Sequence, residues 1–556
     1  MNPSLRLLLL APALWLAATI SPTLAQNTAP RAQTPGTPPP QADNPSRPPL
    51  PAPLTPPPAP APRINGPKVF GVRPGSPFLY TIPATGTPPI TFSADNLPSG
   101  LTLDPATGRI TGTLSQPGNY SVTFGAQNIL HSTKFRIWLR GGLVTVSIKN
   151  TLGSASRPFR IIVGDQIALT PPMGWNSWNC WAGAVNQDKV LRAAKAMVAS
   201  GLAQHGWTYV NIDDTWQGVR GGPFNGIQPD PKKFPDMKGL NDAIHGLGLK
   251  AGIYSTPWIT SYANHIGGSS DNPAGNWTLV TQANGRRNPQ HVVGQYPFAT
   301  NDAKQWAAWG FDYLKYDWNP NDIPHVQEMA DALRASGRDL VFSLSNAAPF
   351  GNAADWARLA NAWRTTGDIR DTWQSMTRNG FSQNRWAPFS GPGHWNDPDM
   401  LVVGRVGWGP SLHATNLTPD EQYTHISLWC LLASPLLLGC DLDQLDPFTL
   451  GLLTNDEVLD VDQDSLGKEA TTVAGDNISY SVYAKPLDDG SLAVGIFNRG
   501  PDAYTLTVKW SDLGLTGPQL VRDLWRQKDL GAFTDQFSAP VPSHGVVLVR
   551  IIPAPK

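Results

Sequence analysis

Lys315 and Asp317 are separated by one residue in the apolar segment Phe311–Trp318. This segment has the composition of a buried β-strand, and residues two apart on a strand point to the same face. Burying a carboxylate costs free energy unless another group pairs with it or chemistry uses it. The two charges therefore form either a structural ion pair or part of a catalytic site, and the neighbouring segments decide between these interpretations.

Apolar runs that end in polar or aromatic residues recur along the chain after residue 170. They give eight predicted strands: Met173–Trp178, Tyr209–Trp216, Lys250–Tyr254, Phe311–Trp318, Leu340–Ser345, Ala362–Asp368, Gly393–Met400 and Pro435–Asp441. Amphipathic helical stretches lie between some of them, such as Asp188–Val198 and Asp302–Trp309. Eight βα units over about 280 residues predict an α/β fold, the (β/α)8 or TIM barrel, whose active sites lie at the carboxyl ends of the strands.

The ends of the predicted strands supply carboxylates, one lysine, one arginine and aromatic rings. These residues are Trp178, Asp213, Asp214, Tyr254, Lys315, Asp317, Arg364, Asp368, Asp397 and Asp399. Carboxylates and cations suit the hydroxyl groups of a carbohydrate, and an aromatic ring covers the apolar face of a sugar. Two carboxyl groups about 5–5.5 Å apart would also suit the nucleophile and the acid/base of a retaining glycosidase. Considered alone, Asp213 and Asp214 could equally cap a following helix.

Other classes of protein fit this sequence less well. The 42 basic and 42 acidic residues balance, which argues against a nucleic-acid partner. His394, His413 and His425 lack the spacing of metal ligands, so we expect no metal and no cofactor. A metal-assisted phosphate enzyme would be sensitive to chelators. A non-catalytic carbohydrate-binding surface protein would have no need of such a pair of catalytic carboxyl groups.

The first 63 residues have two compositions. Arg6, the apolar run Leu7–Ile20 and the small-residue site Thr23–Ala25 are typical of a secretory signal peptide, which we place at residues 1–25. Residues 26–63 contain 15 prolines in 38 residues, which predicts a disordered, extended linker. We therefore expect an exported protein, periplasmic or extracellular. It should not insert into a membrane, because no later segment reaches about 18 uninterrupted apolar residues.

β-type patterns flank the predicted barrel, which we place at residues 167–467. Residues 64–166 contain short strands such as Phe78–Ile82, and the segment Leu97–Thr113 resembles the immunoglobulin-like modules of bacterial exported enzymes. This predicts an N-terminal antiparallel β-sandwich. Residues 121–138 and 144–162 are a near-repeat, and the sequence does not show which copy completes the sheet. Residues 468–556 predict a C-terminal antiparallel β-sandwich domain.

Seven motifs carry a resemblance to a known family. They are Pro172–Trp178, Asn211–Trp216, Lys250–Tyr254, Leu314–Trp318, Trp363–Ile369, Trp395–Met400 and Asn455–Gly467. In this order, over residues 170 to 467, they resemble glycoside hydrolase family 27, the α-galactosidase or melibiase family. The resemblance implies a retaining glycosidase that hydrolyses terminal non-reducing α-D-galactosyl residues of oligosaccharides or polysaccharides by double displacement.

The resemblance also implies roles for individual residues. Asp317 would be the nucleophile and Asp368 the acid/base. The substrate-binding residues would be Trp178, Asp213, Asp214, Tyr254, Lys315, Arg364 and Asp399. We also expect the Lys315 cation to keep Asp317 ionised, because a nearby positive charge lowers the pKa of a carboxyl group.

The fifth predicted strand departs from the α-galactosidase pattern. Ser345 stands where those enzymes commonly carry Glu, and Ala348 stands where a bulkier residue is usual. Small residues at these positions resemble the related α-N-acetylgalactosaminidases, which accommodate an acetamido group at C2. We therefore include Ser345 and Ala348 in the predicted site. The alternative substrates are an α-N-acetylgalactosaminide or another galactose-like sugar such as β-L-arabinopyranose.

The cysteines also depart from the family pattern. Members often follow the nucleophile with a Cys, whereas Trp318 and Asn319 follow it here. The chain has only Cys180, Cys430 and Cys440, so a disulfide framework is not expected. A bond between Cys430 and Cys440 stays open at this point, as does the oligomeric state.

Overall fold

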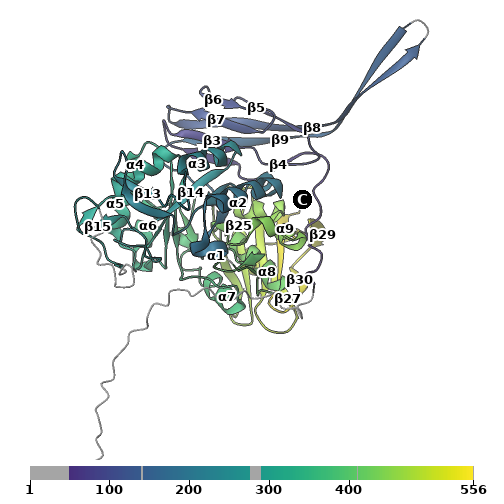
Figure 1. The fold of residues 1–556 in the computed structure, drawn as a ribbon. Helices are drawn as coiled ribbons and strands as arrows, with labels where there is room; N and C mark the ends of the chain where they lie inside the picture. The colour runs from purple at the N-terminus through teal and green to yellow at the C-terminus, as the bar shows by residue number, and fades with distance from the viewer. Residues whose placement is uncertain (1–48, 140–141, 276–289, 410, 555–556) are drawn as a thin grey trace, which may run out of the picture. The chain divides into compact units, whose positions relative to one another are not determined.

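The computed structural model describes residues 49–139, 142–275, 290–409 and 411–554 (Figure 1). The predicted signal peptide lies outside these residues, as does the part of the predicted linker before residue 49. In the part of the chain that is described, no helix has the length and apolar character needed to cross a membrane.

Eight parallel strands form a curled sheet in the order β20-β19-β18-β17-β14-β11-β10-β23. Their bounds are β10 Met173–Asn176, β11 Tyr209–Asn211, β14 Lys250–Ser255, β17 Tyr313–Asp317, β18 Val341–Ser345, β19 Ala362–Arg364, β20 Trp395–Asp397 and β23 Leu436–Leu438. A parallel bridge between Leu401 and Leu438 links the segment after β20 to β23. The predicted barrel and its eight strands are confirmed. Most strands end earlier than predicted, because the polar residues at their carboxyl ends leave the ladder and turn into the site.

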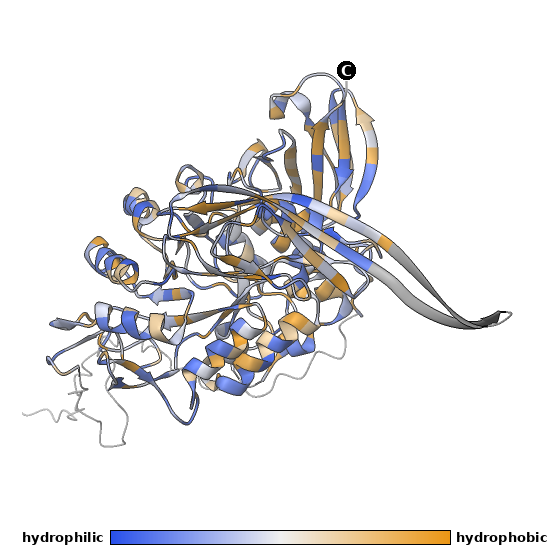
Figure 2. Ribbon diagram, turned by 90° about the horizontal axis from the view of Figure 1, so that it is seen from above, coloured by the Kyte–Doolittle hydropathy of each residue, from blue (hydrophilic) through white to orange (hydrophobic). Residues whose placement is uncertain are grey.

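The helices of the barrel alternate with these strands. They are α1 Trp178–Trp181, α2 Gln187–Ala199, α3 Met237–Gly246, α4 Ala299–Trp309, α5 Ile323–Ala335, α6 Ala353–Leu359, α7 Trp373–Gly380, α8 Pro419–Leu431, α9 Pro447–Leu453 and α10 Asp456–Asp462. Side chains cap several amino ends, for example Asn186 on α2 and Asp322 on α5. Figure 2 shows orange and blue residues mixed along single helices, the pattern of amphipathic helices with one face toward a core.

Short antiparallel pairs interrupt the barrel after some strands. They are β12 Gln217–Gly221 with β13 Gly226–Pro229, β15 Ser269–Ser270 with β16 Tyr296–Pro297, and β21 Arg405–Val406 with β22 His413–Ala414. The first two pairs lie in the long connections that follow β11 and β14. These connections therefore start at the carboxyl ends of barrel strands.

The N-terminal region is a β-sandwich, as predicted. Its strands are β1 Arg63–Ile64, β2 Val69–Val72, β3 Pro77–Thr81, β4 Ala84–Thr85, β5 Ile90–Asp95, β6 Leu101–Leu103, β7 Arg109–Thr113, β8 Gly118–Leu139 and β9 Gly142–Val163. The sheets β2-β9-β8-β5 and β3-β7-β6 enclose a core in which the rings of Phe124 and Phe159 lie 4.4 Å apart.

The near-repeat is explained by strands β8 and β9. They pair continuously from Gly118 with Val163 to Leu139 with Gly142, apart from register shifts near Ile129, so the two copies are the two arms of one long hairpin. The strand β5 pairs only with residues 123–128, and β2 pairs only with residues 160–163. In Figure 1 the two strands run beyond the rest of their sheet as a two-stranded ribbon.

Residues 49–63 correct the prediction of a disordered linker. The backbone N–H of Leu54 donates to the Tyr423 hydroxyl at 2.8 Å, and the Thr55 hydroxyl donates to the Gly451 carbonyl at 2.7 Å. Pro53 lies against Gly451, which leaves no space for a side chain at that position. Because proline rings are apolar and few backbone donors need partners, this part of the segment packs on α8 and α9.

The C-terminal region is also the predicted antiparallel β domain. Its strands are β24 Thr471–Gly475, β25 Tyr480–Pro486, β26 Leu492–Asn498, β27 Tyr504–Lys509, β28 Gln519–Asp523, β29 Lys528–Phe533, β30 Gln536–Val541 and β31 Val546–Pro553. They form the sheet β24-β25-β26-β31-β28-β29 and the pair β27-β30. Val482, Ile496 and Trp510 belong to the core between them.

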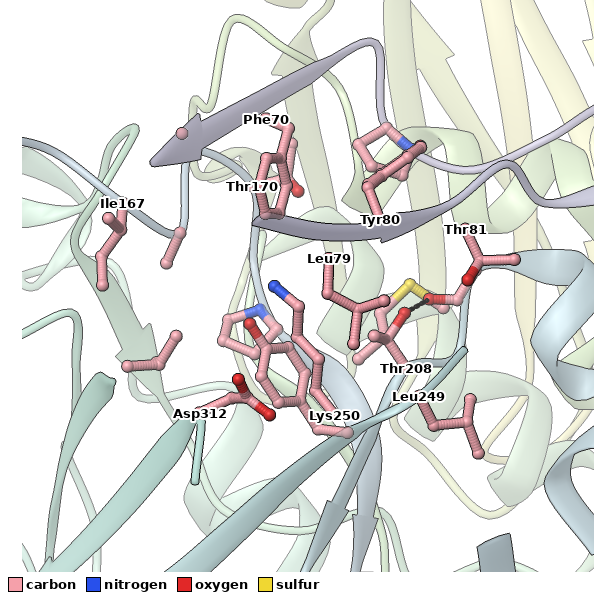
Figure 3. A pocket seen from close by; sticks show the side chains of 18 of the residues that line it. Phe70, Leu79, Tyr80, Thr81, Ile167, Thr170, Thr208, Leu249, Lys250 and Asp312 are labelled. Carbon is pink, nitrogen blue, oxygen red and sulfur yellow. Dashed lines mark hydrogen bonds between the residues drawn. The ribbon is translucent and has the colours of Figure 1, made fainter. Parts of the chain in front are cut away.

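The N-terminal sandwich contacts the barrel where the barrel strands begin. The Arg73 guanidinium pairs with Asp339 just before β18 at 3.2 Å, and Arg109 donates to the Gly246 carbonyl at 2.8 Å. A cavity of about 120 Å³ lies at this contact, and Figure 3 shows residues of both regions on its wall. The Lys250 ammonium in this wall lies 4.4 Å from the centre of the Phe70 ring. The cavity is therefore at the opposite end of the strands from the predicted site.

Candidate active site

The predicted site residues all lie at or just beyond the carboxyl ends of barrel strands. Tyr254, Lys315, Asp317, Ser345 and Arg364 are in strands, whereas Trp178, Asp213, Asp214, Ala348, Asp368 and Asp399 follow strands closely. Hydrogen bonds and ion pairs connect most of them, as described below. The helix that Asp213 and Asp214 could have capped does not exist, because the strand β12 follows them.

Asp317 is held from two sides at the end of β17. Its side chain is buried, with the residue only 7% exposed. The Tyr254 hydroxyl donates to Asp317 Oδ2 at 3.0 Å, and the Asn346 amide donates to Asp317 Oδ1 at 2.6 Å. Each carboxylate oxygen therefore has a donor, which fixes the orientation of the group.

Asn346 is a site residue that the sequence prediction missed. It follows Ser345, and on a continuing strand it would point away from the face that carries Ser345. Its φ of 74° places it in the left-handed region instead, which Asn adopts more readily than most residues. This turn brings its amide to Asp317. An Asn directly after a predicted strand was the available signal.

The relation between Lys315 and Asp317 differs from the prediction. The Lys315 ammonium donates to Asp213 Oδ2 at 2.8 Å and makes its ion pair there. Burial raises the pKa of Asp317 to about 6, although the nearby charges of Lys315 and Arg364 act to lower it. The lysine charge therefore reduces the pKa shift of Asp317 without cancelling it, because desolvation is the larger effect.

Asp213 and Asp214 are buried and held largely by backbone groups. The Ser177 hydroxyl accepts from the Asp213 N–H at 2.9 Å, which links this turn to the end of β10. Asp214 Oδ2 accepts from the Ala263 N–H at 3.0 Å, which links it to the connection after β14. Asp213 Oδ2 also faces Lys315, so this pair of carboxylates is joined to the strand that carries Asp317.

Arg364 connects two carboxylates and Ser345. Its guanidinium donates to the Ser345 hydroxyl at 3.1 Å and to Asp368 Oδ1 at 2.9 Å, and it lies 3.3 Å from Asp399 Oδ2. Burial lowers the pKa of Arg364, but the carboxylates of Asp399 and Asp368 outweigh burial and raise it. The guanidinium is therefore a permanent positive charge in the centre of the site.

Asp368 differs from Asp317 in its exposure. Its side chain is 61% exposed, so one face of the carboxyl group is open to solvent. Burial acts to raise its pKa, but the charge of Arg364 and the hydrogen bond from it leave the pKa below the usual range. The two proposed catalytic groups are thus one buried carboxyl with a raised pKa and one open carboxyl with a lowered pKa.

Asp397 and Asp399 form a second buried pair at the carboxyl end of β20. Asp397 Oδ1 accepts from the Asp399 N–H at 2.7 Å, and Asp399 Oδ2 accepts from the Ile369 N–H at 2.7 Å. Burial and the Asp399 carboxylate raise the pKa of Asp397 to about 7. Asp399 has a φ of 88°, a strained backbone for a residue other than Gly, which is common at functional sites.

The remaining predicted residues line the surroundings of this network. Trp178 is half-buried at the start of α1, and its backbone N–H donates to Asn176 Oδ1 at 2.9 Å. Ala348 is buried, and its N–H donates to the Arg364 carbonyl at 2.8 Å. Cys430 and Cys440 do not form a disulfide, because all three cysteines, Cys180, Cys430 and Cys440, are buried free thiols.

Comparisons with known proteins cover all three regions of this chain. The family model described as Alpha galactosidase A matches residues 170–271 and 278–464. The model of the α-galactosidase C-terminal β-sandwich domain matches residues 478–551, and an Ig-domain model matches residues 61–136.

Individual relatives agree with these matches. α-Galactosidase 2 of Arabidopsis thaliana is 38% identical over 395 residues, which are 69% of this chain and 90% of the plant protein. A solved structure from Bacteroides fragilis is 31% identical, with a TM-score of 0.74, and the match covers 89% of this chain and 98% of that one. A variant of a family 27 β-L-arabinopyranosidase from Geobacillus stearothermophilus, solved with arabinose, is 31% identical, with a TM-score of 0.61 and coverages of 70% and 98%. The chain therefore belongs to the α-galactosidase family of glycoside hydrolases, family 27, as its motifs predict.

Proposed function

We propose that this enzyme is a retaining α-galactosidase that removes terminal non-reducing α-D-galactosyl residues by double displacement. The observation that carries the proposal is the contrast between Asp317 and Asp368. Asp317 is buried and held by Tyr254 and Asn346, as a nucleophile must be, whereas Asp368 is 61% exposed, as a group that meets the departing part of the substrate must be. Arg364 donates to Asp368, and its charge also acts on Asp317.

The first step forms a bond between Asp317 and the anomeric carbon. The glycosidic C–O bond breaks as this bond forms, and the proton of Asp368 moves to the departing oxygen. In the second step a water molecule attacks the same carbon, Asp368 takes its proton, and the bond to Asp317 breaks. Two inversions give a product with the configuration of the substrate.

The proton that the first step needs must reach Asp368. The raised pKa of Asp317 and the lowered pKa of Asp368 mean that a single proton shared by the pair lies mainly on Asp317. A bound sugar covers the exposed side of Asp368, and desolvation then raises its pKa. A sugar hydroxyl that accepts from Arg364 would also weaken the ion pair with Asp368. Substrate binding therefore favours the reactive distribution of the proton.

The other polar groups suit the hydroxyls of a galactosyl ring. From the family motifs, Asp213 and Asp214 would accept from the 4- and 6-hydroxyls, Lys315 would donate to the 3-hydroxyl, and Arg364 would donate around C2 and C3. The link from Lys315 to Asp213 at 2.8 Å supports this proposal, because it holds the two groups for one ring edge together. Trp178 would cover part of the pocket wall.

A second substrate is favoured by one contact. The Ser345 hydroxyl accepts from Arg364, and Ser345 and Ala348 are both small, so their side chains would leave room for a substituent at the 2-position. An α-N-acetylgalactosaminide is therefore the alternative substrate, with β-L-arabinopyranosides as a further one.

Three substrates measured side by side test the proposal. The kcat/KM of the enzyme is compared on 4-nitrophenyl α-D-galactopyranoside, its N-acetylgalactosaminide analogue and 4-nitrophenyl β-L-arabinopyranoside. We expect the galactoside to be preferred. A preference for the N-acetylgalactosaminide would identify the enzyme as an α-N-acetylgalactosaminidase instead. Inactivity on all three substrates would reject the proposed function.

We also propose that the enzyme acts after export, in the periplasm or outside the cell. The basic, apolar and small-residue segments of the first 25 residues support this proposal. Fractionation of cells that produce the full chain, with amino-terminal sequencing of the mature protein, tests it. We expect cleavage after Ala25, and an uncleaved cytoplasmic protein would contradict the proposal.

A further inference from the structure

An aromatic cluster lies in the connection that follows β14. The rings of Trp258 and His291 are stacked with centres 4.9 Å apart, and the Tyr262 ring meets Trp258 edge-on at 5.0 Å. Isolated bridges join Trp258 to Val293 and Thr260 to Ile266, so the described part of this connection is folded on itself. The cluster is therefore a defined surface.

The exposure of the three rings is uneven. Trp258 is 8% exposed and supports the cluster from within, whereas Tyr262 is 38% exposed. A large aromatic ring supported from behind and open in front has the form of a binding platform. Packing alone accounts for Trp258 but leaves the open side of Tyr262 unexplained.

The connection is attached to the catalytic centre at this cluster. The N–H of Ala263, the residue after Tyr262, donates to Asp214 Oδ2 at 3.0 Å. Further along, the buried Arg220 donates to the Gly267 carbonyl at 2.8 Å, which fixes the connection from its other side. Tyr262 is thus held next to the site by two independent attachments.

The charges that act on the Tyr262 phenol are those of the proposed catalytic groups. Burial raises the pKa of Tyr262, and the carboxylates of Asp317 and Asp368 raise it further. The phenol is therefore close enough to sense both proposed catalytic groups. Together with the bond from Ala263 to Asp214, this puts the partly exposed ring at the edge of the proposed pocket, where the departing part of a substrate leaves it.

We propose that the Tyr262 ring, supported by Trp258 and His291, binds the sugar on the leaving-group side of the scissile bond. The chemical class of this ligand is a neutral pyranose whose apolar C–H face stacks on the ring. The inference rests on the proposed function, because it assigns the second sugar of the same substrate. It predicts that loss of the ring lowers kcat/KM on galactosyl oligosaccharides more than on galactosides whose leaving group is not a sugar.

The experiment compares two substrates that differ only in the leaving group. α-D-Galactosyl fluoride has no sugar for the platform, whereas melibiose has a glucose on the leaving-group side. Wild type, Tyr262→Ala and Tyr262→Phe are assayed on both, and the measured quantity is the ratio of kcat/KM for melibiose to kcat/KM for the fluoride. Tyr504→Ala is the matched control, because Tyr504 is a 53% exposed tyrosine of the C-terminal domain.

We expect Tyr262→Ala to lower the ratio roughly tenfold, through loss of one aromatic contact face. Tyr262→Phe should keep the ratio, since it keeps the ring, and Tyr504→Ala should leave it unchanged. The inhibition constant of free galactose should be the same in all variants, which excludes a general distortion of the site.

Equal losses on both substrates in Tyr262→Ala would overturn the inference, because the ring would then act on the catalytic groups and not on the second sugar. A loss in Tyr262→Phe as large as in Tyr262→Ala would overturn it too, since the hydroxyl would then be the active group. If wild type turned over neither substrate, the proposed function itself would fail, which is a different result from a change in the ratio.

Discussion

At Asp317 burial and charge act in opposite directions. Burial raises its pKa to about 6, Lys315 and Arg364 lower it, and Tyr254 and Asn346 donate to its two oxygens. Such a group is costly for the fold and suited to chemistry, because it can be either protonated or ionised near neutral pH. The pH dependence of activity and stability should therefore follow the titration of Asp317.

The pH dependence of kcat/KM follows from the proton that Asp317 and Asp368 share. The reactive form needs one proton on the pair, and the pair loses it as the pH rises through about 6. We expect kcat/KM to be highest below pH 6 and to fall above it. In kcat the fall should come at higher pH, because bound sugar desolvates Asp368. Full pH–rate profiles measure both limbs, and a kcat/KM that rises through pH 6 would be inconsistent with this account.

Replacing Tyr254 with Phe should shift the pH above which kcat/KM falls. The hydroxyl donates to the ionised form of Asp317, so its loss raises the pKa of the carboxyl group by about one unit. The alkaline limb of kcat/KM should shift upward by the same amount and the maximal rate should fall, since ionised Asp317 becomes less favourable. A lower rate with an unmoved limb would show that Tyr254 contacts only the substrate.

Replacing Asp317 with Asn should abolish turnover and change stability with pH. The folded pKa of about 6 lies above the reference value of 3.8, so the folded protein keeps a proton that the unfolded chain has lost. Wild-type stability therefore falls as the pH rises from about 4 to about 6, by up to roughly 3 kcal/mol. The Asp317→Asn variant has no carboxyl group at this position and should not lose this free energy of unfolding. Denaturant unfolding at pH 4.5 and 7.5 checks whether the variant gains relative stability at the higher pH.

At the scale of elements, the carboxyl ends of the strands explain both success and failure of the sequence prediction. Apolar runs with polar ends predicted all eight strands and put the candidate residues at their carboxyl ends, because a parallel barrel collects these ends at one rim. Asn346 and Tyr262 were missed. Asn346 reaches Asp317 through a left-handed turn, and Tyr262, the proposed platform, lies in a folded connection, so neither follows from the pattern of apolar runs.

A buried ion pair supports the connection that carries Tyr262. Arg220 and Asp302 are both fully buried, lie 2.6 Å apart and join β12 to α4, while Arg220 also donates to Gly267. Replacing Asp302 with Ala leaves a buried guanidinium without its partner, which should cost about 3–5 kcal/mol of unfolding free energy. The double variant Arg220→Met with Asp302→Leu should cost less, and thermal unfolding distinguishes the two. Equal losses in both would mean that packing volume dominates.

At the scale of the whole molecule, the proposed catalytic groups and the N-terminal sandwich lie at opposite ends of the barrel strands. Arg73 and Arg109 contact residues before β18 and β14, whereas the proposed catalytic residues lie at the end of β17 (Asp317) and after β19 (Asp368). The composition of residues 49–63 predicted a linker, but their contacts with Tyr423 and Gly451 depend on surfaces that only the folded barrel provides. Local composition therefore could not predict this packing, and the long β8–β9 hairpin was ambiguous because its two arms resemble each other.

Because of this separation, we expect the Arg73–Asp339 pair to affect stability but not activity. Its side chains are 22% and 18% exposed, so a double-mutant cycle of Arg73→Ala and Asp339→Ala should give a coupling of about 1 kcal/mol in unfolding free energy. The kcat/KM on 4-nitrophenyl α-galactoside should stay within the error of wild type in Arg73→Ala. A large loss of activity without a loss of stability would indicate communication between the two ends of the barrel.

The central claim is that Asp317 forms a covalent bond to the sugar, and trapping that bond tests it most directly. 5-Fluoro-α-D-galactosyl fluoride has a good leaving group, and its ring fluorine slows the second step more than the first, so a glycosyl-enzyme accumulates. Peptide mass spectrometry of the inactivated enzyme then locates the label. We predict one fluorogalactosyl group on Asp317. A label on Asp368 or on another carboxylate, or turnover with inversion and no label, would contradict the account.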